Sequence, residues 1–75
     1  MVKKIMVRNK IALDQFLKWC RVASTGGQGK YYIINDMVRV NGVIENRRSR
    51  KLTNGDLVEV KNTGSFLVVS QLEDT

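Results

Sequence analysis

The chain has 75 residues, with 13 Lys and Arg against 7 Asp and Glu, and a formal net charge of +6 at pH 7. A domain this short buries only about 60% of its unfolded surface, which favours a shallow binding face over a deep catalytic cleft. One cysteine and no histidine exclude an intrachain disulfide and argue against a structural zinc site. No apolar run nears the roughly 20 residues of a membrane span and no signal peptide is visible, so a cytoplasmic location is expected by default.

The positive charge is confined to the first two-thirds of the chain. Residues 1–51 hold twelve basic and three acidic residues, whereas residues 52–75 hold one basic and four acidic residues. A basic excess restricted to part of a small domain is typical of a nucleic-acid-binding surface. The alternative interpretation is a charged surface that only increases solubility.

The first half of the chain predicts a strand followed by two helices. Residues 2–7 alternate in polarity and predict a short strand, with Ile5 and Val7 on one side. Residues 13–23 predict a helix, because apolar side chains recur with the spacing of one buried stripe at Leu13, Phe16, Leu17 and Cys20. After a break at residues 24–27, where Thr25 can act as a cap, residues 27–35 predict a second helix with Tyr32 and Ile33 as its core candidates.

The second half predicts strands and turns. Residues 38–40 predict a strand with Arg39 pointing away from the core, and Asn41-Gly42 is a strong hairpin signal. Further strands are expected at residues 57–60 and 66–69, with a turn at residues 62–64 and a frayed acidic tail. This order predicts a single α+β domain over residues 1–75, in which two short helices pack against a small, mainly antiparallel sheet.

Four basic residues gather in one short stretch after the hairpin. We call residues 46–52 the basic segment; its cations are Arg47, Arg48, Arg50 and Lys51. Guanidinium groups fork onto phosphate oxygens and stack on bases, so several in a row can follow an RNA backbone. The alternative is a solvated connector. In either case we expect a loop that crosses between strands and contributes little to the core.

Several motifs in a fixed order resemble the RNA-binding domain of the ribosomal protein S-four family. The matching stretches are Leu13-Asp14-Gln15-Phe16-Leu17-Lys18, Val38-Arg39-Val40-Asn41-Gly42, and Lys51-Leu52 followed by Gly55-Asp56 and Val58. They span residues 11–60. Thr25-Gly26-Gly27 and the basic segment look like the short stand-alone bacterial branch, the YaaA/YbcJ-like proteins. One departure is visible: where the family has two successive basic residues near the start of the second helix, this chain has Lys30 and Tyr31.

The resemblance implies an RNA face built from the second helix, the turn before it and the hairpin. It implies structured RNA, often ribosomal, as the partner. We therefore expect a non-catalytic RNA-binding protein that acts on ribosomal RNA, as a ribosome-assembly or ribosome-associated factor. The predicted RNA contacts are Arg47, Arg48, Arg50 and Lys51, supported by Lys30, Arg39 and Tyr31. A base could also stack on Trp19, although such a side chain more often covers the edge of a small core.

The residues offer no catalytic set. There is no His, the carboxylates pair on no predicted element, and Cys20 has no base to activate it. The run Gly26-Gly27-Gln28-Gly29-Lys30 lacks the spacing of a nucleotide-binding phosphate loop. No cofactor, metal or small-molecule substrate is expected. The rival to RNA binding is a protein-interaction module, whose basic face would dock on an acidic protein partner or on a separate RNA-modifying enzyme.

Overall fold

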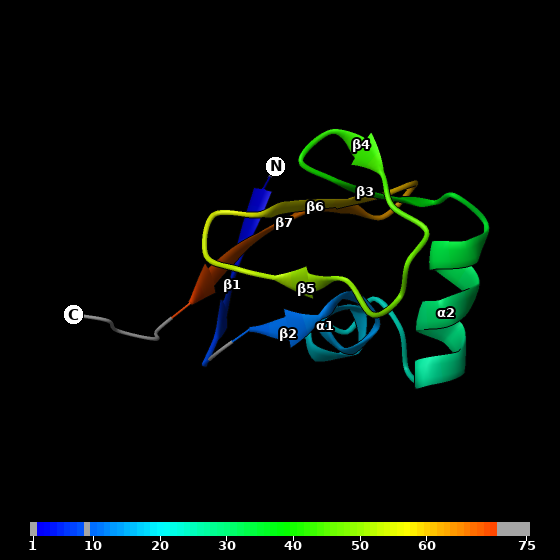
Figure 1. The fold of residues 1–75 in the computed structure, drawn as a ribbon, viewed down its shortest axis with the longest axis horizontal. Helices are drawn as coiled ribbons and strands as arrows, with labels where there is room; N and C mark the ends of the chain where they lie inside the picture. Colours follow the sequence, from blue (N-terminus) through cyan, green and yellow to red (C-terminus); the bar gives the residue numbers. More distant parts are fainter. Residues whose placement is uncertain (1, 9, 71–75) are drawn as a thin grey trace.

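The computed structural model describes residues 2–8 and 10–70 (Figure 1). The elements in chain order are β1 (Val2–Val7), β2 (Ile11–Ala12), α1 (Leu13–Trp19), α2 (Gly26–Ile34), β3 (Val38–Val40), β4 (Val43–Ile44), β5 (Lys51–Leu52), β6 (Leu57–Val60) and β7 (Gly64–Ser70). The acidic tail, for which fraying was predicted, lies outside the described residues at positions 71–75.

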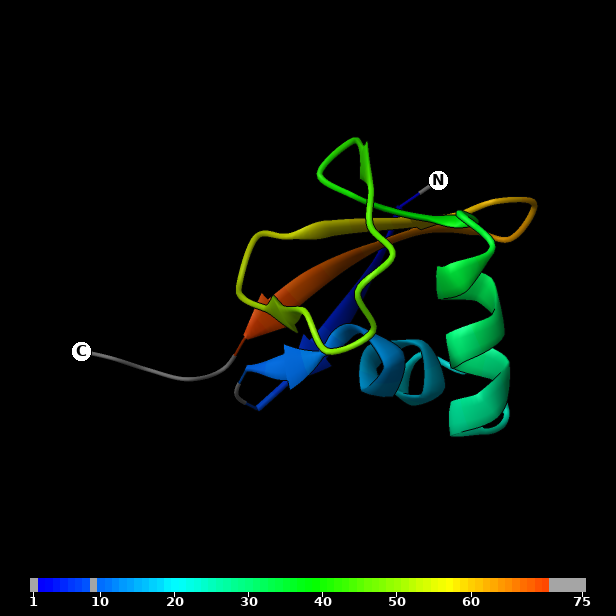
Figure 2. The same cartoon turned by 45° about the vertical axis from the view of Figure 1, so that its right-hand side comes forward.

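The described strands form a five-stranded sheet in the order β1-β7-β6-β3-β4 and a separate two-stranded pair of β2 with β5. In the larger sheet β1 runs parallel to β7, and the other neighbours are antiparallel. Both helices lie on one side of this sheet, with α2 at the end away from the last residues of β7 (Figures 1 and 2). The predicted fold class, two helices against a small and mainly antiparallel sheet, is confirmed.

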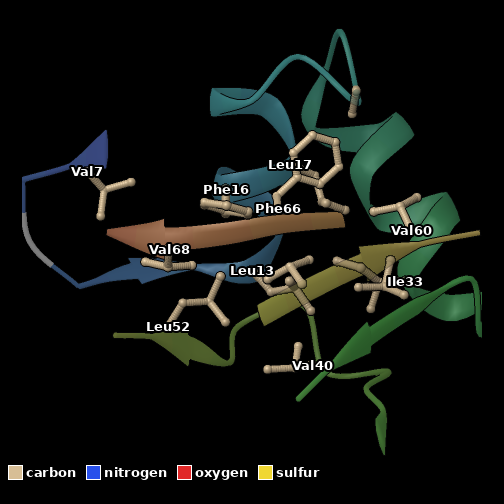
Figure 3. Close-up of a cluster of buried hydrophobic side chains, with 13 residues drawn as sticks. Val7, Leu13, Phe16, Leu17, Ile33, Val40, Leu52, Val60, Phe66 and Val68 are labelled. Atoms are coloured by element: carbon tan, nitrogen blue, oxygen red, sulfur yellow. The ribbon is translucent and has the colours of Figure 1, made fainter. Parts of the chain in front are cut away.

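The core fills the space between the inner face of the sheet and the two helices (Figure 3). Alternate strand residues point inward, and the buried members from β3, β6 and β7 are Val38, Val40, Val58, Val60, Phe66 and Val68. They meet Leu13, Phe16 and Leu17 from α1 and Ile33 from α2, each with no exposed surface. Burying one such side chain contributes about 1.5–3 kcal/mol, so packing rather than helix propensity holds the two short helices.

The first helix is shorter than the sequence predicted. It ends at Trp19 instead of residue 23, because Arg21 adopts a left-handed backbone with φ of 66°. The N–H groups of Val22 and Ala23 both donate to the carbonyl of Leu17, which closes the helix end. Cys20 therefore follows the helix, although it still packs against the core, and its partial burial raises the pKa of its thiol.

The second helix begins with two reciprocal hydrogen bonds. Thr25 Oγ1 accepts from the Gln28 N–H at 3.1 Å, and Gln28 Oε1 accepts from the Ser24 N–H at 2.7 Å. The bond to Thr25 satisfies the Gln28 N–H, one of the groups that a helix start leaves without a partner, and the bond from Ser24 ties the preceding residue to the same turn. The predicted cap at Thr25 is confirmed, and the helix begins at Gly26, one residue earlier than expected. After the helix the chain turns at Asp36, whose φ of 58° is left-handed.

The hairpin at Asn41-Gly42 is also confirmed. Both residues have positive φ angles, 54° and 85°, as a tight turn with the twist of its strands requires. The Asn41 side chain ties this turn to the start of β6: its Nδ2 donates to Asp56 Oδ1, and its Oδ1 accepts from the Leu57 N–H. The hairpin is therefore held at two points, which fixes where the following residues begin.

We predict that Gly42→Ala lowers the free energy of unfolding by about 1 kcal/mol or more, because a Cβ is strained at φ of 85° although nothing else lies within 4 Å. For a domain of this size, that corresponds to a fall of about 4–8 °C in Tm. The control is Gly27→Ala in α2, where the new Cβ would meet only Thr25 Oγ1 at 3.9 Å. Thermal melting should show the loss only for Gly42→Ala, and an equal Tm for both variants would contradict this interpretation.

Candidate nucleic-acid interface

The basic segment is fastened to the start of α1 through its backbone. The Arg50 carbonyl accepts from the Leu13 N–H at 2.8 Å, and the Arg48 carbonyl accepts from the Asp14 N–H at 3.1 Å. The residue before α1, Ala12, has no side chain that could cap the helix, so these carbonyls take that role. The end of the segment continues as β5, where Lys51 pairs with Ala12 and Leu52 pairs with Ile11.

The expectation of a loop that adds little to the core therefore holds for residues 46–50, which form no helix or strand, and is wrong for residues 51–52. Leu52 has no exposed surface and belongs to the core cluster, and Lys51–Leu52 form a strand rather than part of a loop. Two-residue strands carry no periodic pattern, which explains why the sequence did not predict this pairing. The segment is an ordered part of the fold that leaves its cations on the surface.

Glu45, just before the basic segment, holds two of the arginines. Its carboxylate accepts from Arg47 Nε at 2.9 Å, from the Arg47 backbone N–H at 3.1 Å and from Arg50 Nη1 at 2.9 Å. Its own N–H donates to the Val38 carbonyl at 3.0 Å, which anchors it to β3. We call Glu45, Arg47 and Arg50 the carboxylate clamp. Sequence reasoning missed it, although a lone acid beside a basic cluster was the available signal.

The two arginines of the clamp offset the free-energy cost of burying the charged carboxylate of Glu45. Glu45 is only 7% exposed, and a buried carboxylate is unfavourable unless it is paired and hydrogen-bonded. Hydrogen bonds from Arg47 and then Arg50 lower the pKa of Glu45 to about 2, against the opposing effect of burial. The same pairing raises the pKa of Arg47. The carboxylate is therefore charged at neutral pH, and its charge fixes the geometry of the turn.

The clamp leaves both arginines accessible to different degrees. The Arg47 side chain is 72% exposed, and that of Arg50 is 31% exposed. A guanidinium has five N–H donors, so each can hold the carboxylate and still donate to another anion. Arg48 and Lys51 are exposed, and among the described residues their side chains have no hydrogen bond or ion pair. The segment therefore presents two clamped cations and two cations without partners.

The second helix meets the same region through a glycine. A Cβ at Gly29 would lie 3.3 Å from the Asp14 carbonyl oxygen, so α2 approaches the start of α1 closely at this point. The Asp14 N–H is the group that binds the Arg48 carbonyl. Lys30, the residue after Gly29, is exposed on α2.

Two predicted contacts have different surroundings. Tyr31 is 57% exposed, and its ring lies edge-on to that of Tyr32 with centroids 6.0 Å apart.

Arg39 points to the face of the sheet opposite the helices, because its neighbours Val38 and Val40 point into the core. In the pairing of β3 with β6, Arg39 lies opposite Glu59. The structure therefore does not bring Arg39 together with the basic segment, and the roles of all seven predicted contact residues stay predictions.

The part of the chain that the structure describes contains no group of three or more His, Cys, Asp or Glu side chains that could hold a metal ion. In the same residues, no helix is long and apolar enough to cross a membrane.

We predict that the clamp makes stability depend on acid pH. The folded-state pKa of Glu45, about 2, lies below its ordinary value of 4.5. The charged carboxylate therefore stabilises the fold fully above about pH 4.5, and this contribution is lost as pH falls from there toward 2. At pH 7, Glu45→Gln should lower the free energy of unfolding by about 1–3 kcal/mol, and the difference from the wild type should shrink by pH 3.

Urea unfolding of the variant and of the wild type, at pH 7 and at pH 3, measures the difference in their free energies of unfolding at each pH. The control is Glu59→Gln, the same chemical change at an acid on β6 outside the clamp. A Glu45→Gln variant as stable as the wild type at pH 7 would show that the clamp contributes nothing to the fold.

Comparison with known proteins identifies the family of the chain. Residues 4–69 match the S4 domain family, a longer stretch than the residues 11–60 on which the resemblance rested. A protein of Bacillus subtilis (strain 168), named probable ribosome maturation protein RlbA, is 47% identical over 60 residues, which cover 80% of this chain and 84% of that protein. The family match extends the likeness to β1 and β7, so it includes both strands of the parallel pair. The chain belongs to the S4 domain family.

Proposed function

We propose that this protein binds structured ribosomal RNA without catalysing a reaction, and that it acts in ribosome maturation. The observation that carries the proposal is the basic segment: a run of cations whose backbone is fixed to α1 and whose arginines are oriented by a buried carboxylate. The S4 domain family and the name of the Bacillus subtilis relative support RNA, and ribosomal RNA in particular, as the partner.

The rigidity of the segment matters for affinity. Ordering a long, flexible side chain on binding costs about 0.5–1.5 kcal/mol, and this cost falls when the free protein already holds the side chain in place. Arg47 and Arg50 are held by Glu45 before any RNA arrives. A rigid row of donors also suits structured RNA, which proteins recognise mainly by its shape and its backbone.

The cations divide into two roles in this proposal. Arg48 and Lys51 are free to pair with phosphates, and the exposed Lys30 on α2 is a further candidate for a phosphate contact. Arg47 and Arg50 share the charge of Glu45, so the clamp as a whole carries one net positive charge and acts mainly by geometry. Tyr31, exposed next to Lys30, offers a ring on which an unpaired base can stack. Arg39 lies on the other face of the sheet and would contact only an RNA that wraps around the hairpin.

We predict that Arg48→Glu with Lys51→Glu weakens binding to a ribosomal RNA hairpin by at least about tenfold, because each change removes a phosphate partner and adds a repelling charge. Arg47 and Arg50 are left intact, so the clamp and the fold should survive. The matched control is Lys3→Glu with Lys4→Glu on β1, which changes the net charge by the same amount. Filter binding at one fixed salt concentration measures both variants, and thermal melting checks that both are folded.

Equal weakening by the two double variants would contradict the assignment of the site to the basic segment. Unchanged binding in both variants would contradict that assignment as well. Failure of the wild-type protein to bind the hairpin, or co-purification of protein partners that persists after nuclease treatment, would instead favour a module that docks on an acidic protein.

A further inference from the structure

A second surface of the molecule centres on Trp19, the only tryptophan of the chain. It is the last residue of α1, and its large aromatic side chain is 59% exposed. Its Nε1–H donates to the carbonyl of Met6 at the end of β1, with a distance of 3.0 Å. The polar edge of the indole is therefore occupied and the ring orientation is fixed, while more than half of the side chain remains open to solvent.

Trp19 lines a small open pocket of about 260 Å³ together with Val7, Arg8, Lys10 and Ile11. Buried Val7 and half-buried Ile11 supply apolar surface, and exposed Arg8 and Lys10 supply positive charge. Pockets for drug-sized molecules usually measure about 300–1,000 Å³, so this one suits a single planar ring rather than a whole cofactor. We call it the indole pocket.

The lining has the chemistry of a nucleotide site. An exposed, oriented aromatic face is a stacking platform for a base, and neighbouring cations neutralise the attached phosphates. Among the residues that the structure describes, no acidic side chain lines the pocket. An unpaired base fits this combination of a flat ring and two cations better than an acidic peptide does, because a carboxylate would use the cations and leave the indole face exposed.

The indole pocket is connected to the basic segment through two short strands. Ile11 lines the pocket and pairs with Leu52 of β5, and the next residue, Ala12, pairs with Lys51. One residue of strand advances only about 3.3 Å, so the backbone of Lys51 lies close to the pocket, although strand alternation turns the side chains of Ile11 and Lys51 to opposite sides of the pair. A single RNA strand that contacts both has to pass along the edge of this pair. The views in Figures 1 and 2 agree that β2 and β5 lie side by side next to α1.

We propose that the indole pocket binds one unpaired base of an RNA strand that leaves the structured element held at the basic segment. This inference rests on the proposed function for the class of partner, RNA. It adds a specificity: the protein recognises a junction between a paired and an unpaired stretch, with the unpaired base stacked on Trp19 and its phosphates beside Arg8 and Lys10.

The first experiment uses an RNA hairpin with and without a short single-stranded extension, labelled for fluorescence anisotropy. The extension should tighten binding by about fivefold or more, the effect of one stacked base. Trp19→Ala should abolish this gain while binding of the blunt hairpin stays unchanged, and Trp19→Phe should keep part of the gain. A gain that survives in Trp19→Ala would overturn the proposal. Thermal melting confirms that each variant is folded before its affinity is compared.

The second experiment uses the intrinsic fluorescence of Trp19, which no other tryptophan obscures. A short oligouridylate should quench it in a saturable way, and a fully paired RNA without unpaired ends should not. Quenching should persist in the Arg48→Glu, Lys51→Glu variant. No quenching in the wild type, or stronger quenching by an oligoglutamate peptide than by the oligouridylate, would overturn the assignment to an RNA base.

The two experiments separate this inference from the proposed function. If the blunt hairpin does not bind but oligouridylate still quenches Trp19, binding of structured RNA at the basic segment is wrong and the indole pocket stands as a base site. If the blunt hairpin binds but neither the extension nor the oligouridylate has an effect, the proposed function stands and the indole pocket is wrong.

Discussion

The buried carboxylate of Glu45 is the constraint on which the rest of this interface depends. A charge with 7% exposure is tolerated only because two guanidinium groups and one backbone N–H surround it. Satisfying Glu45 forces the chain after β4 into a turn that brings the arginines back over the carboxylate. The same turn aims the carbonyls of residues 48 and 50 at the start of α1 and delivers residues 51–52 to β2. The same turn thus pairs the charge of Glu45, caps the start of α1 and positions β5 beside β2.

Under the proposed function, this arrangement resolves a conflict between folding and binding. A run of like charges repels itself and is most easily left as a disordered loop, which would lose much entropy on meeting an anionic partner. Here one acidic residue removes part of the repulsion, and the backbone contacts supply the order. The result is a positively charged surface that needs little rearrangement to bind. Arg48 and Lys51 remain available because the clamp uses Arg47 and Arg50.

Local features were predictable from the sequence, and long-range ones were not. The Asn41-Gly42 hairpin and the Thr25 cap follow from the conformational preferences of the residues themselves, and both are confirmed. The first helix was predicted too long because its apolar stripe continues through Cys20, whereas the backbone reverses at Arg21. The pairing of β2 with β5 was missed because strands of two residues show no alternation.

In the candidate site, too, the local features were predictable from the sequence and the long-range contacts were not. Composition and the charge run identified the basic segment, but they treated its four cations as equivalent. Only the fold shows that Glu45 engages two of them, because that contact depends on the path of the chain after β4. Arg39 was grouped with the segment because of its charge and its place in the hairpin motif, and strand alternation directs it to the face of the sheet away from the helices. Its outward direction was predictable from Val38 and Val40, but which other groups share that face was not.

The central claim is that the clamped basic segment, and not the open face of the sheet, is the RNA surface. Backbone amide chemical shifts recorded during titration with a ribosomal RNA hairpin test it most directly, because one titration compares the basic segment with the open face of the sheet in the same sample. The largest shifts should fall on residues 46–52 and on Lys30 and Tyr31, with small shifts at Arg39 and Glu59. Largest shifts on the open face of the sheet, around Arg39, Glu59 and β7, with an unchanged basic segment, would contradict the account.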